Sequence, residues 1–174
     1  TCIVALKCAD GRILMGADSA GVAHYSLMTR IDPKIYRVSG MLIGFTSSFR
    51  MGQLLGYSLS VPEHHSDIPI ERYMATDFIN AVRQCLKTGG YSKKENEVES
   101  AGMFLVGYRS RIFCVDSDYQ VGECSDPYWA VGCGFDLALG SLFTSAEHIT
   151  DQRNRVLLAL EAAAHFSAGV RAPF

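Results

Sequence analysis

The sequence lacks long apolar runs and any excess of basic residues. No stretch approaches the roughly 18 consecutive apolar residues that a membrane-spanning helix needs, so we expect no membrane partner. The formal net charge of −2 and the pI near 6.2 indicate no basic surface of the kind that binds nucleic acid. We therefore expect no nucleic-acid partner either.

Paired cysteines are also missing. The six cysteines are spread along the chain without a C-x-x-C pair, and this spacing argues against a metal site. Cys2, Cys85 and Cys114 lie in apolar stretches, where a reduced cysteine packs as a small hydrophobic residue. The simplest setting for such thiols is the reducing cytoplasm. We expect a cytoplasmic protein with neither a cofactor nor a metal.

What the sequence does contain is enough apolar material for one sizeable core. A length of 174 residues predicts a single domain that covers residues 1–174. Hydrophobic residues make up 48% of the chain and its mean hydropathy is +0.11, slightly more than a lone soluble monomer needs. The surplus indicates either a sheet that is buried on both faces or surfaces that are buried between subunits.

Hydrophobic periodicity divides the chain into strands and helices. Turn signals at Ala9-Asp10-Gly11 and Ser39-Gly40 separate apolar runs, whereas the period becomes helical after Ser48, with Ser47 or Ser48 as the N-cap. The charged segment 91–100 is expected to be an exposed loop. The expected strands are 2–8, 12–17, 34–38, 41–45, 102–108 and 111–116, with shorter candidates at 119–123 and 129–131; the expected helices are 48–59, 70–87, 135–143 and 150–165.

The order of these elements predicts the layers of the fold. Strands are followed by two helices, and the pattern then repeats. Each sheet has to be covered on its outer face as well as its inner face. Two antiparallel sheets between two helical layers satisfy this requirement. We therefore predict an α+β fold, a four-layer α-β-β-α sandwich of two antiparallel sheets.

The first residue suggests a particular chemistry, because a terminal Thr1 carries a hydroxyl and a free amine together. A hydroxyl is a weak nucleophile without a base, and an α-amine titrates near neutral pH and can accept the proton. A lysine would stabilise developing negative charge, and a carboxylate would hold that lysine. Asp18 directly follows the expected strand 12–17, and Lys34 opens the expected strand 34–38, so neighbouring strands can supply both groups. A terminal threonine also arises when a chain is trimmed. The hypothesis that Thr1 is a nucleophile therefore depends on Asp18 and Lys34.

The motifs around these residues resemble a known family. Thr-x-x-Val-Ala-Leu-Lys at the start, Gly16-Ala17-Asp18-Ser19, and Lys34 sixteen residues after Asp18 resemble a proteasome β-subunit and its relatives HslV, Anbu and the β-proteobacterial proteasome homologue. The segment 44–52 resembles the last of these most, and weaker similarity continues to Gly132-Cys133-Gly134 and to residues 162–165. The resemblance implies an N-terminal nucleophile hydrolase fold and cleavage of peptide bonds through an acyl-enzyme on Thr1.

The resemblance also implies which residues act. Thr1 would supply the nucleophilic oxygen and the amine, with Asp18 and Lys34 as the charge pair beside it. The backbone N–H of Ser48, at the start of the first expected helix, would donate to the oxyanion.

Three positions depart from the family pattern. Ser48 stands where the family usually has Gly, Cys133 where proteasomes have Ser near the amine, and Ser167 where they have a supporting Asp in the last helix. Cys133 fits a core thiol as well as a neighbour of the active site. Because a thiol and a hydroxyl support the amine less strongly, we expect slow turnover.

The substrate would lie extended beside Thr1. The resemblance implies that it adds a strand between Gly21-Val22 and the segment 46–50. Asp32 would favour a basic or polar side chain in the first specificity pocket, whereas Arg50 would oppose it. The implied substrate-binding residues are Gly21, Val22, Asp32, Thr46 and Arg50.

Threonine endopeptidase is the leading hypothesis for the function. The family implies homo-oligomeric stacked rings that enclose the nucleophiles, unfolded polypeptide or peptide substrates, and optionally an ATP-dependent unfoldase partner. One alternative is an amidase or acylase that acts on small molecules, although the short chain has no insertion that would build a private pocket. The other is a weakly active structural ring subunit, against which the presence of Thr1, Asp18 and Lys34 argues.

Overall fold

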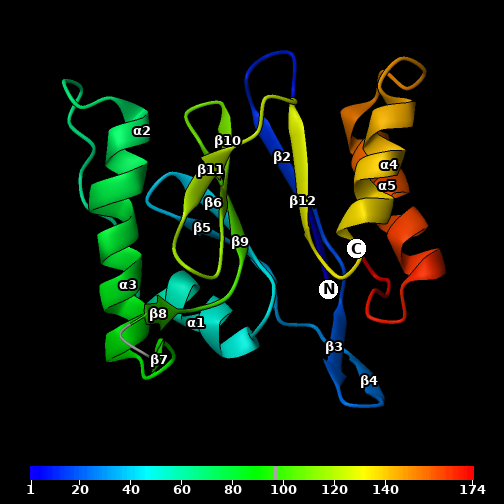
Figure 1. The fold of residues 1–174 in the computed structure, drawn as a ribbon. Helices are drawn as coiled ribbons and strands as arrows, with labels where there is room; N and C mark the ends of the chain where they lie inside the picture. Colours follow the sequence, from blue (N-terminus) through cyan, green and yellow to red (C-terminus); the bar gives the residue numbers. More distant parts are fainter. Residues whose placement is uncertain (96–97) are drawn as a thin grey trace.

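The computed structural model, which describes residues 1–95 and 98–174, has four layers (Figure 1). A three-stranded antiparallel sheet faces a five-stranded antiparallel sheet, and helices cover the outer side of each. This arrangement confirms the predicted α-β-β-α sandwich. The candidate site lies at the end of the sandwich where the chain begins, and both sheets contribute residues to it.

The elements have the following bounds. The three-stranded sheet has the order β12-β1-β2, with β1 at Cys2–Lys7, β2 at Ile13–Ala17 and β12 at Tyr128–Gly132. The five-stranded sheet has the order β11-β10-β9-β6-β5, with β5 at Ile35–Val38, β6 at Met41–Phe45, β9 at Phe104–Tyr108, β10 at Arg111–Val115 and β11 at Val121–Glu123. Helices α4 (Phe135–Ser145) and α5 (Gln152–Phe166) cover the first sheet. Helices α1 (Phe49–Tyr57), α2 (Ile70–Tyr73) and α3 (Ile79–Thr88), with the π-helical segment η1 (Met74–Phe78), cover the second.

Strand β1 shows why the sequence forms two sheets. Cys2, Val4 and Leu6 pack toward α4 and α5, whereas Ile3 and Ala5 pack toward the five-stranded sheet. All five side chains are buried. Successive side chains of a strand point to opposite faces, so a strand that is covered on both faces has to be apolar throughout. Thr1 therefore extends from a strand that is buried on both faces.

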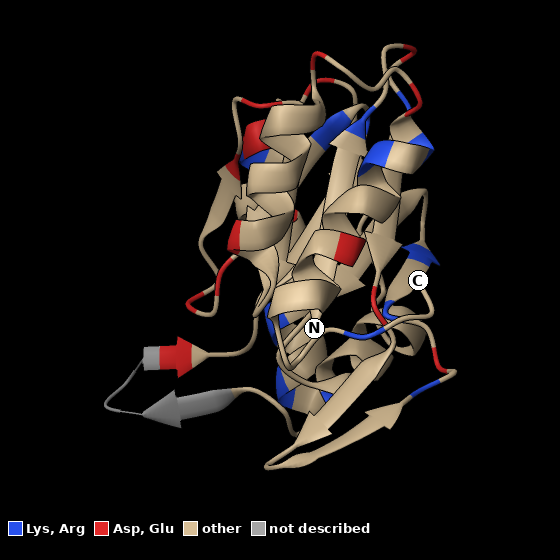
Figure 2. Cartoon of the chain, turned by 90° about the vertical axis from the view of Figure 1, so that its right-hand side faces the viewer, with Lys and Arg blue, Asp and Glu red and all other residues tan. Residues whose placement is uncertain are grey.

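Two hairpins were not predicted. Strands β3 (Ala20–Ala23) and β4 (Ser26–Thr29) form a two-stranded sheet that projects from the site end of the molecule, and Figure 2 shows this sheet free of acidic and basic residues. Its turn has a positive φ of 52° at His24, where no glycine marks it in the sequence. Strands β7 (Lys93–Glu95) and β8 (Val98–Ser100) pair within the segment expected as a loop, which corrects that expectation; residues 96–97 lie outside the described residues.

Among the described residues, no helix combines the length and the apolar character that a bilayer span requires. All six cysteines are free thiols, from the buried Cys2 to the exposed Cys133.

Candidate active site

Thr1 lies where the ends of β1 and β12 come together. The backbone of Gly132, which has a positive φ of 101°, passes so close that a Cβ there would lie 2.3 Å from the Thr1 carbonyl oxygen. Only glycine combines this approach with a positive φ at no steric cost. The local sequence Gly132-Cys133 therefore places the next side chain, the Cys133 thiol, directly beside Thr1.

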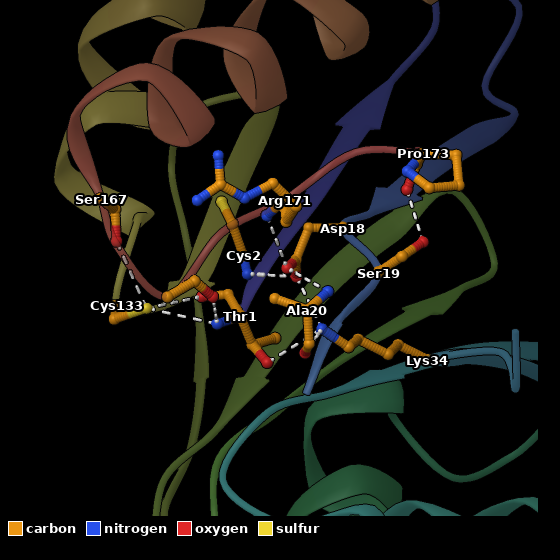
Figure 3. A network of polar contacts seen from close by, with 11 residues as sticks. Thr1, Cys2, Asp18, Ser19, Ala20, Lys34, Cys133, Ser167, Arg171 and Pro173 are labelled. Carbon is orange, nitrogen blue, oxygen red and sulfur yellow. Dashed lines mark hydrogen bonds and ion pairs between the residues drawn. The ribbon is translucent and has the colours of Figure 1, made fainter. Parts of the chain in front are cut away.

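Asp18 is held in the short link between β2 and β3. Its carboxylate accepts backbone hydrogen bonds from Cys2 (2.8 Å), Ala20 (2.9 Å) and Arg171 (3.2 Å), and a fourth from Lys34 Nζ (2.8 Å) (Figure 3). The carboxyl side chain has no exposed surface. A buried carboxylate is tolerated when donors satisfy its oxygens in this way. Asp18 consequently joins three separate segments of the chain around one fixed charge.

Lys34, the residue directly before β5, points from the five-stranded sheet toward Thr1. Its ammonium donates to Asp18 Oδ1 at 2.8 Å, to the Ala20 carbonyl at 2.7 Å and to Thr1 Oγ1 at 3.1 Å. An ammonium group has three N–H donors, so each is used. Lys34 is only 4% exposed, which limits screening of its charge by water. The geometry therefore directs one buried positive charge at the threonine hydroxyl.

The Thr1 amine lies on the opposite side of the residue, among groups from β12 and the segment after α5. Its nitrogen is 3.2 Å from Cys133 Sγ and donates to the Gly169 carbonyl. Ser167 Oγ is 3.5 Å from the same sulfur. Burial raises the pKa of the Cys133 thiol, but hydrogen bonds from Ser167 and from the Thr1 ammonium outweigh burial and lower this pKa below its ordinary value. Cys133 is thus a neighbour of the amine and not a core thiol.

The segment 167–174 completes this environment with backbone groups. The Ser19 N–H donates to the Arg171 carbonyl at 2.8 Å, while the Arg171 N–H donates to Asp18. A Cβ on Gly169 would lie 2.6 Å from Cys133 Sγ, so this position needs a residue without a side chain. Sequence reasoning missed Gly169 and Arg171, because a backbone contribution leaves no signature in residue type.

The turn 46–48 lies on the far side of the Thr1 hydroxyl. Ser48 is the N-cap of α1, and its Oγ accepts from the Arg50 N–H at 3.1 Å. The backbone N–H of Ser48, however, donates to the Thr46 carbonyl at 2.8 Å, so it is already engaged in this conformation. Ser47 has a positive φ of 71°, and its N–H has no acceptor among the described residues. From the sequence, Ser47 is only an alternative N-cap, and its backbone N–H is not expected as a donor.

A pocket of about 240 Å³ opens beside these groups. Its walls are Thr1, Ala20, Val22, Phe45, Phe49 and Cys133, together with the turn 46–48. Of the predicted substrate-binding residues, Val22 and Thr46 therefore line this pocket directly.

The other three predicted substrate-binding residues lie around it or apart from it. Arg50 turns away and donates to the Gly89 carbonyl at 3.3 Å. Gly21, in β3, packs so closely on Arg30 that a Cβ would lie 2.6 Å from that side chain. Asp32 accepts three hydrogen bonds from Arg30, which lower the pKa of its carboxyl. Arg30 thus pairs with the Asp32 carboxylate, and its guanidinium also lies 3.9 Å from the ring centroid of Phe49.

The comparison with known proteins finds relatives by structure. No protein-family model and no curated protein sequence matches the chain. Among solved structures, BPH of Thiobacillus denitrificans in complex with epoxomicin has a TM-score of 0.82 and 23% identity, over 99% of this chain and 94% of that chain. Eukaryotic HslV of Trypanosoma brucei has a TM-score of 0.68 and 14% identity, over 98% and 94%. Anbu of Yersinia bercovieri has a TM-score of 0.67 and 12% identity, over 99% and 78%.

These matches extend over nearly the whole chain, whereas the identities are low. They show the arrangement of the elements, and the chemistry has to be inferred from the geometry of the site. The chain has the fold of the proteasome-type N-terminal nucleophile hydrolases.

Proposed function

We propose that this chain is a threonine endopeptidase and that Thr1 is the first residue of its mature form. The observation that carries the proposal is the Lys34 ammonium, which lies 3.1 Å from Thr1 Oγ1. Its two other donors are fixed by Asp18 and by the Ala20 carbonyl. A lysine that served only to satisfy Asp18 would have no need to reach the hydroxyl of a terminal threonine.

Acylation follows from this arrangement. The Thr1 oxygen attacks the carbonyl carbon of the scissile peptide bond, and its proton passes to the α-amine of the same residue, directly or through one water. Lys34 stabilises the negative charge that develops on the attacking oxygen. The tetrahedral intermediate then expels the leaving amine, which takes the proton from the Thr1 ammonium. An ester between Thr1 Oγ and the acyl half of the substrate remains.

Deacylation reverses these roles. A water molecule attacks the ester carbonyl while the α-amine accepts its proton, and the threonine oxygen leaves with that proton to restore the hydroxyl. In its neutral form the amine still has N–H groups that can donate to the Gly169 carbonyl. The Cys133 thiol contacts the same nitrogen and accepts a hydrogen bond from Ser167. These contacts position the amine for both steps.

The oxyanion needs a backbone donor on the opposite side of the scissile carbonyl. In this conformation the free donor of the turn is the N–H of Ser47, and the expected donor, Ser48, becomes available only if it leaves the Thr46 carbonyl. Removal of one such donor typically weakens transition-state stabilisation by about 3 kcal/mol. A turn that has to rearrange before both donors face the substrate supports the expectation of slow turnover.

The substrate class follows from the edge of β3. This strand pairs only with β4 in its sheet, so its other edge can accept an extended chain along Gly21 and Val22. Asp32 is paired with Arg30, and Arg50 donates to the Gly89 carbonyl. Neither residue therefore favours a charged side chain near the scissile bond. We propose unfolded polypeptides or peptides as the substrates.

A ring-shaped particle is part of the same proposal. Large apolar residues on or next to the β3–β4 hairpin are exposed, including Tyr25 (107%), Ile31 (102%) and Met28 (64%). Such a patch is typical of a surface that another chain covers. Identical subunits in stacked rings of a cytoplasmic particle would cover it, and an ATP-dependent unfoldase would be an optional partner.

The test compares wild type with Thr1→Ala and Thr1→Ser. Intact mass first establishes that Thr1 is the terminal residue, and peptide hydrolysis and the mass shift after epoxomicin treatment are then measured. We expect wild type to cleave peptides and to gain one inhibitor mass, and Thr1→Ser to keep part of both activities because it retains the hydroxyl and amine. Equal hydrolysis by the Thr1→Ala variant, or turnover of acylated small molecules without peptides, would refute the proposal.

A further inference from the structure

A second pocket, of about 390 Å³, lies behind the catalytic turn. It opens between β11 and β12, which are edge strands of the two sheets. Its apolar walls include Met103, Ile112, Trp129, Val131 and Phe135. The size and lining are typical of a site that binds an apolar group.

The pocket exists because the core between the sheets is not closed at this edge. Ile112 and Val131 belong to the buried cluster between the sheets, and Met103 and Trp129 pack against that cluster. A Cβ on Gly122, in β11, would have no heavy atom within 4 Å. The opening therefore exposes core-type side chains, which water solvates poorly.

The pocket adjoins the catalytic pocket across a single turn of backbone. Both are lined by Thr46 and Ser47, whereas their other walls come from different elements. Met103 ties the turn to the apolar pocket: it accepts from the Thr46 N–H at 3.1 Å, and its own N–H donates to Ser47 Oγ at 3.2 Å. Gly132, next to the Thr1 carbonyl, also lines the apolar pocket.

An extended substrate places successive side chains on opposite sides of its backbone, with about 3.3 Å between residues. The side chain before the scissile bond would enter the pocket formed by Val22 and Phe49. The next side chain would then face the other side of the turn 46–48, where the apolar pocket lies. We infer that this pocket binds the side chain of the residue that follows the scissile bond, and that it selects a large apolar or aromatic group. This inference rests on the proposed peptidase function.

The polar groups at the rim support an uncharged occupant. The Glu123 side chain already forms an ion pair with Arg111, and its backbone belongs to β11, which pairs with β10. Asp116 accepts a hydrogen bond from Gln120 Nε2 at 3.4 Å. An acidic side chain would meet these two carboxylates, and a basic one would have to compete with Arg111 for Glu123. An apolar side chain reaches the walls without disturbing either interaction.

The experiment uses internally quenched peptides of one sequence that differ only in the residue after the scissile bond. Phenylalanine, leucine, glycine and aspartate are compared, and mass spectrometry of the products locates the cleaved bond. We expect kcat/KM for phenylalanine or leucine to exceed that for glycine by at least about tenfold, because an apolar pocket discriminates on this scale. Aspartate should be cleaved most slowly.

Two leucine substitutions at open glycines provide the matched pair. Gly122→Leu fills the apolar pocket, whereas Gly140→Leu adds the same side chain on α4, where a Cβ also has no heavy atom within 4 Å. In Gly122→Leu the ratio of the phenylalanine and glycine rates should fall toward one, and in Gly140→Leu it should stay as in wild type. The epoxomicin adduct reports separately whether Thr1 still reacts in each variant.

The outcomes separate the inference from the proposed function. Thr1-dependent cleavage with equal rates for all four residues would overturn the inference and leave the peptidase proposal standing. A change of particle size in Gly122→Leu without a change in the ratio would assign the pocket to contact between copies. An absence of Thr1-dependent cleavage of any peptide would overturn both.

Discussion

Asp18 and Lys34 carry opposite charges that are almost wholly removed from water, with side-chain exposures of 0% and 2%. Neither charge would be tolerated there alone, because burial of an unpaired ion is highly unfavourable. Three backbone N–H donors support the carboxylate, and Asp18 forms an ion pair of 2.8 Å with the Lys34 ammonium. The ion pair thus keeps both buried charges partnered, and under the proposed function its lysine would also act on the Thr1 hydroxyl.

Asp18→Ala is therefore expected to damage both stability and activity. It leaves the Lys34 ammonium buried without a counter-charge, and loss of one partner of a buried pair costs about 3–5 kcal/mol in the free energy of unfolding. Urea denaturation measures this change, and peptide hydrolysis should be lost in parallel. The exposed pair of Asp10 and Arg12 provides the control, since Asp10→Ala should leave the urea midpoint unchanged. Similar midpoints for both variants would contradict the role of burial.

Cys133 is expected to be more reactive toward iodoacetamide than Cys2 and Cys114. Its pKa is lowered, whereas burial and the charge of Asp18 raise the pKa of Cys2 to about 12, and burial raises that of Cys114 to about 11. Because the thiolate is the reactive form, Cys133 should label first at pH 7, with a rate that levels off at a pH below the ordinary 9.0. Peptide mapping measures the order of labelling. Faster labelling of Cys2 or Cys114 would contradict this prediction.

The residue types of the site could be found from the sequence more readily than its backbone groups. Asp18 and Lys34 are charged residues at strand ends, where a buried role is unusual and a spacing motif is visible. Gly169 and Arg171 act through a carbonyl and an N–H, which every residue has. The engagement of the Ser48 N–H by Thr46 depends on the positive φ of Ser47, and a serine gives no warning of that conformation.

At the scale of elements, packing explains which strands the sequence predicts. Strand β1 forms an unbroken apolar run because both faces are covered, and its bounds match the prediction to within one residue. The β3–β4 hairpin is largely exposed and has no glycine in its turn, so neither alternating burial nor a turn signal marks it. Its strands pair with each other, and that pairing cannot be read from composition.

Helix α5 provides a prediction at this scale. Its N-cap, Asp151, accepts from the N–H groups of Arg153 (2.8 Å) and Asn154 (3.1 Å). Asp151→Ala should lower the free energy of unfolding by about 1 kcal/mol, because both donors lose their acceptor. Asp151→Asn keeps a capping oxygen and should retain most of the stability. Thermal unfolding of the three proteins measures the difference, and equal loss in both variants would show that charge and not capping is responsible.

At the scale of the whole molecule, the exposed hairpin predicts assembly. The double variant Tyr25→Ser, Met28→Ser removes two of its exposed apolar side chains and should lower the mass of the particle measured by light scattering. Phe143→Ser is the matched control, because Phe143 is similarly exposed (72%) but lies on α4, in the helical layer that covers the other sheet. A wild-type protein that is monomeric, or a control variant that dissociates equally, would contradict assembly through the hairpin.

The contacts of residues 169–171 have a consequence for biosynthesis. The carbonyl of Gly169 holds the Thr1 amine, and the N–H of Arg171 holds Asp18, so segments far apart in the sequence meet at the nucleophile. A ribosome releases Thr1 and Asp18 long before these groups emerge. Under the proposed function, the growing polypeptide would therefore carry an incomplete catalytic site until the segment 167–171 has docked.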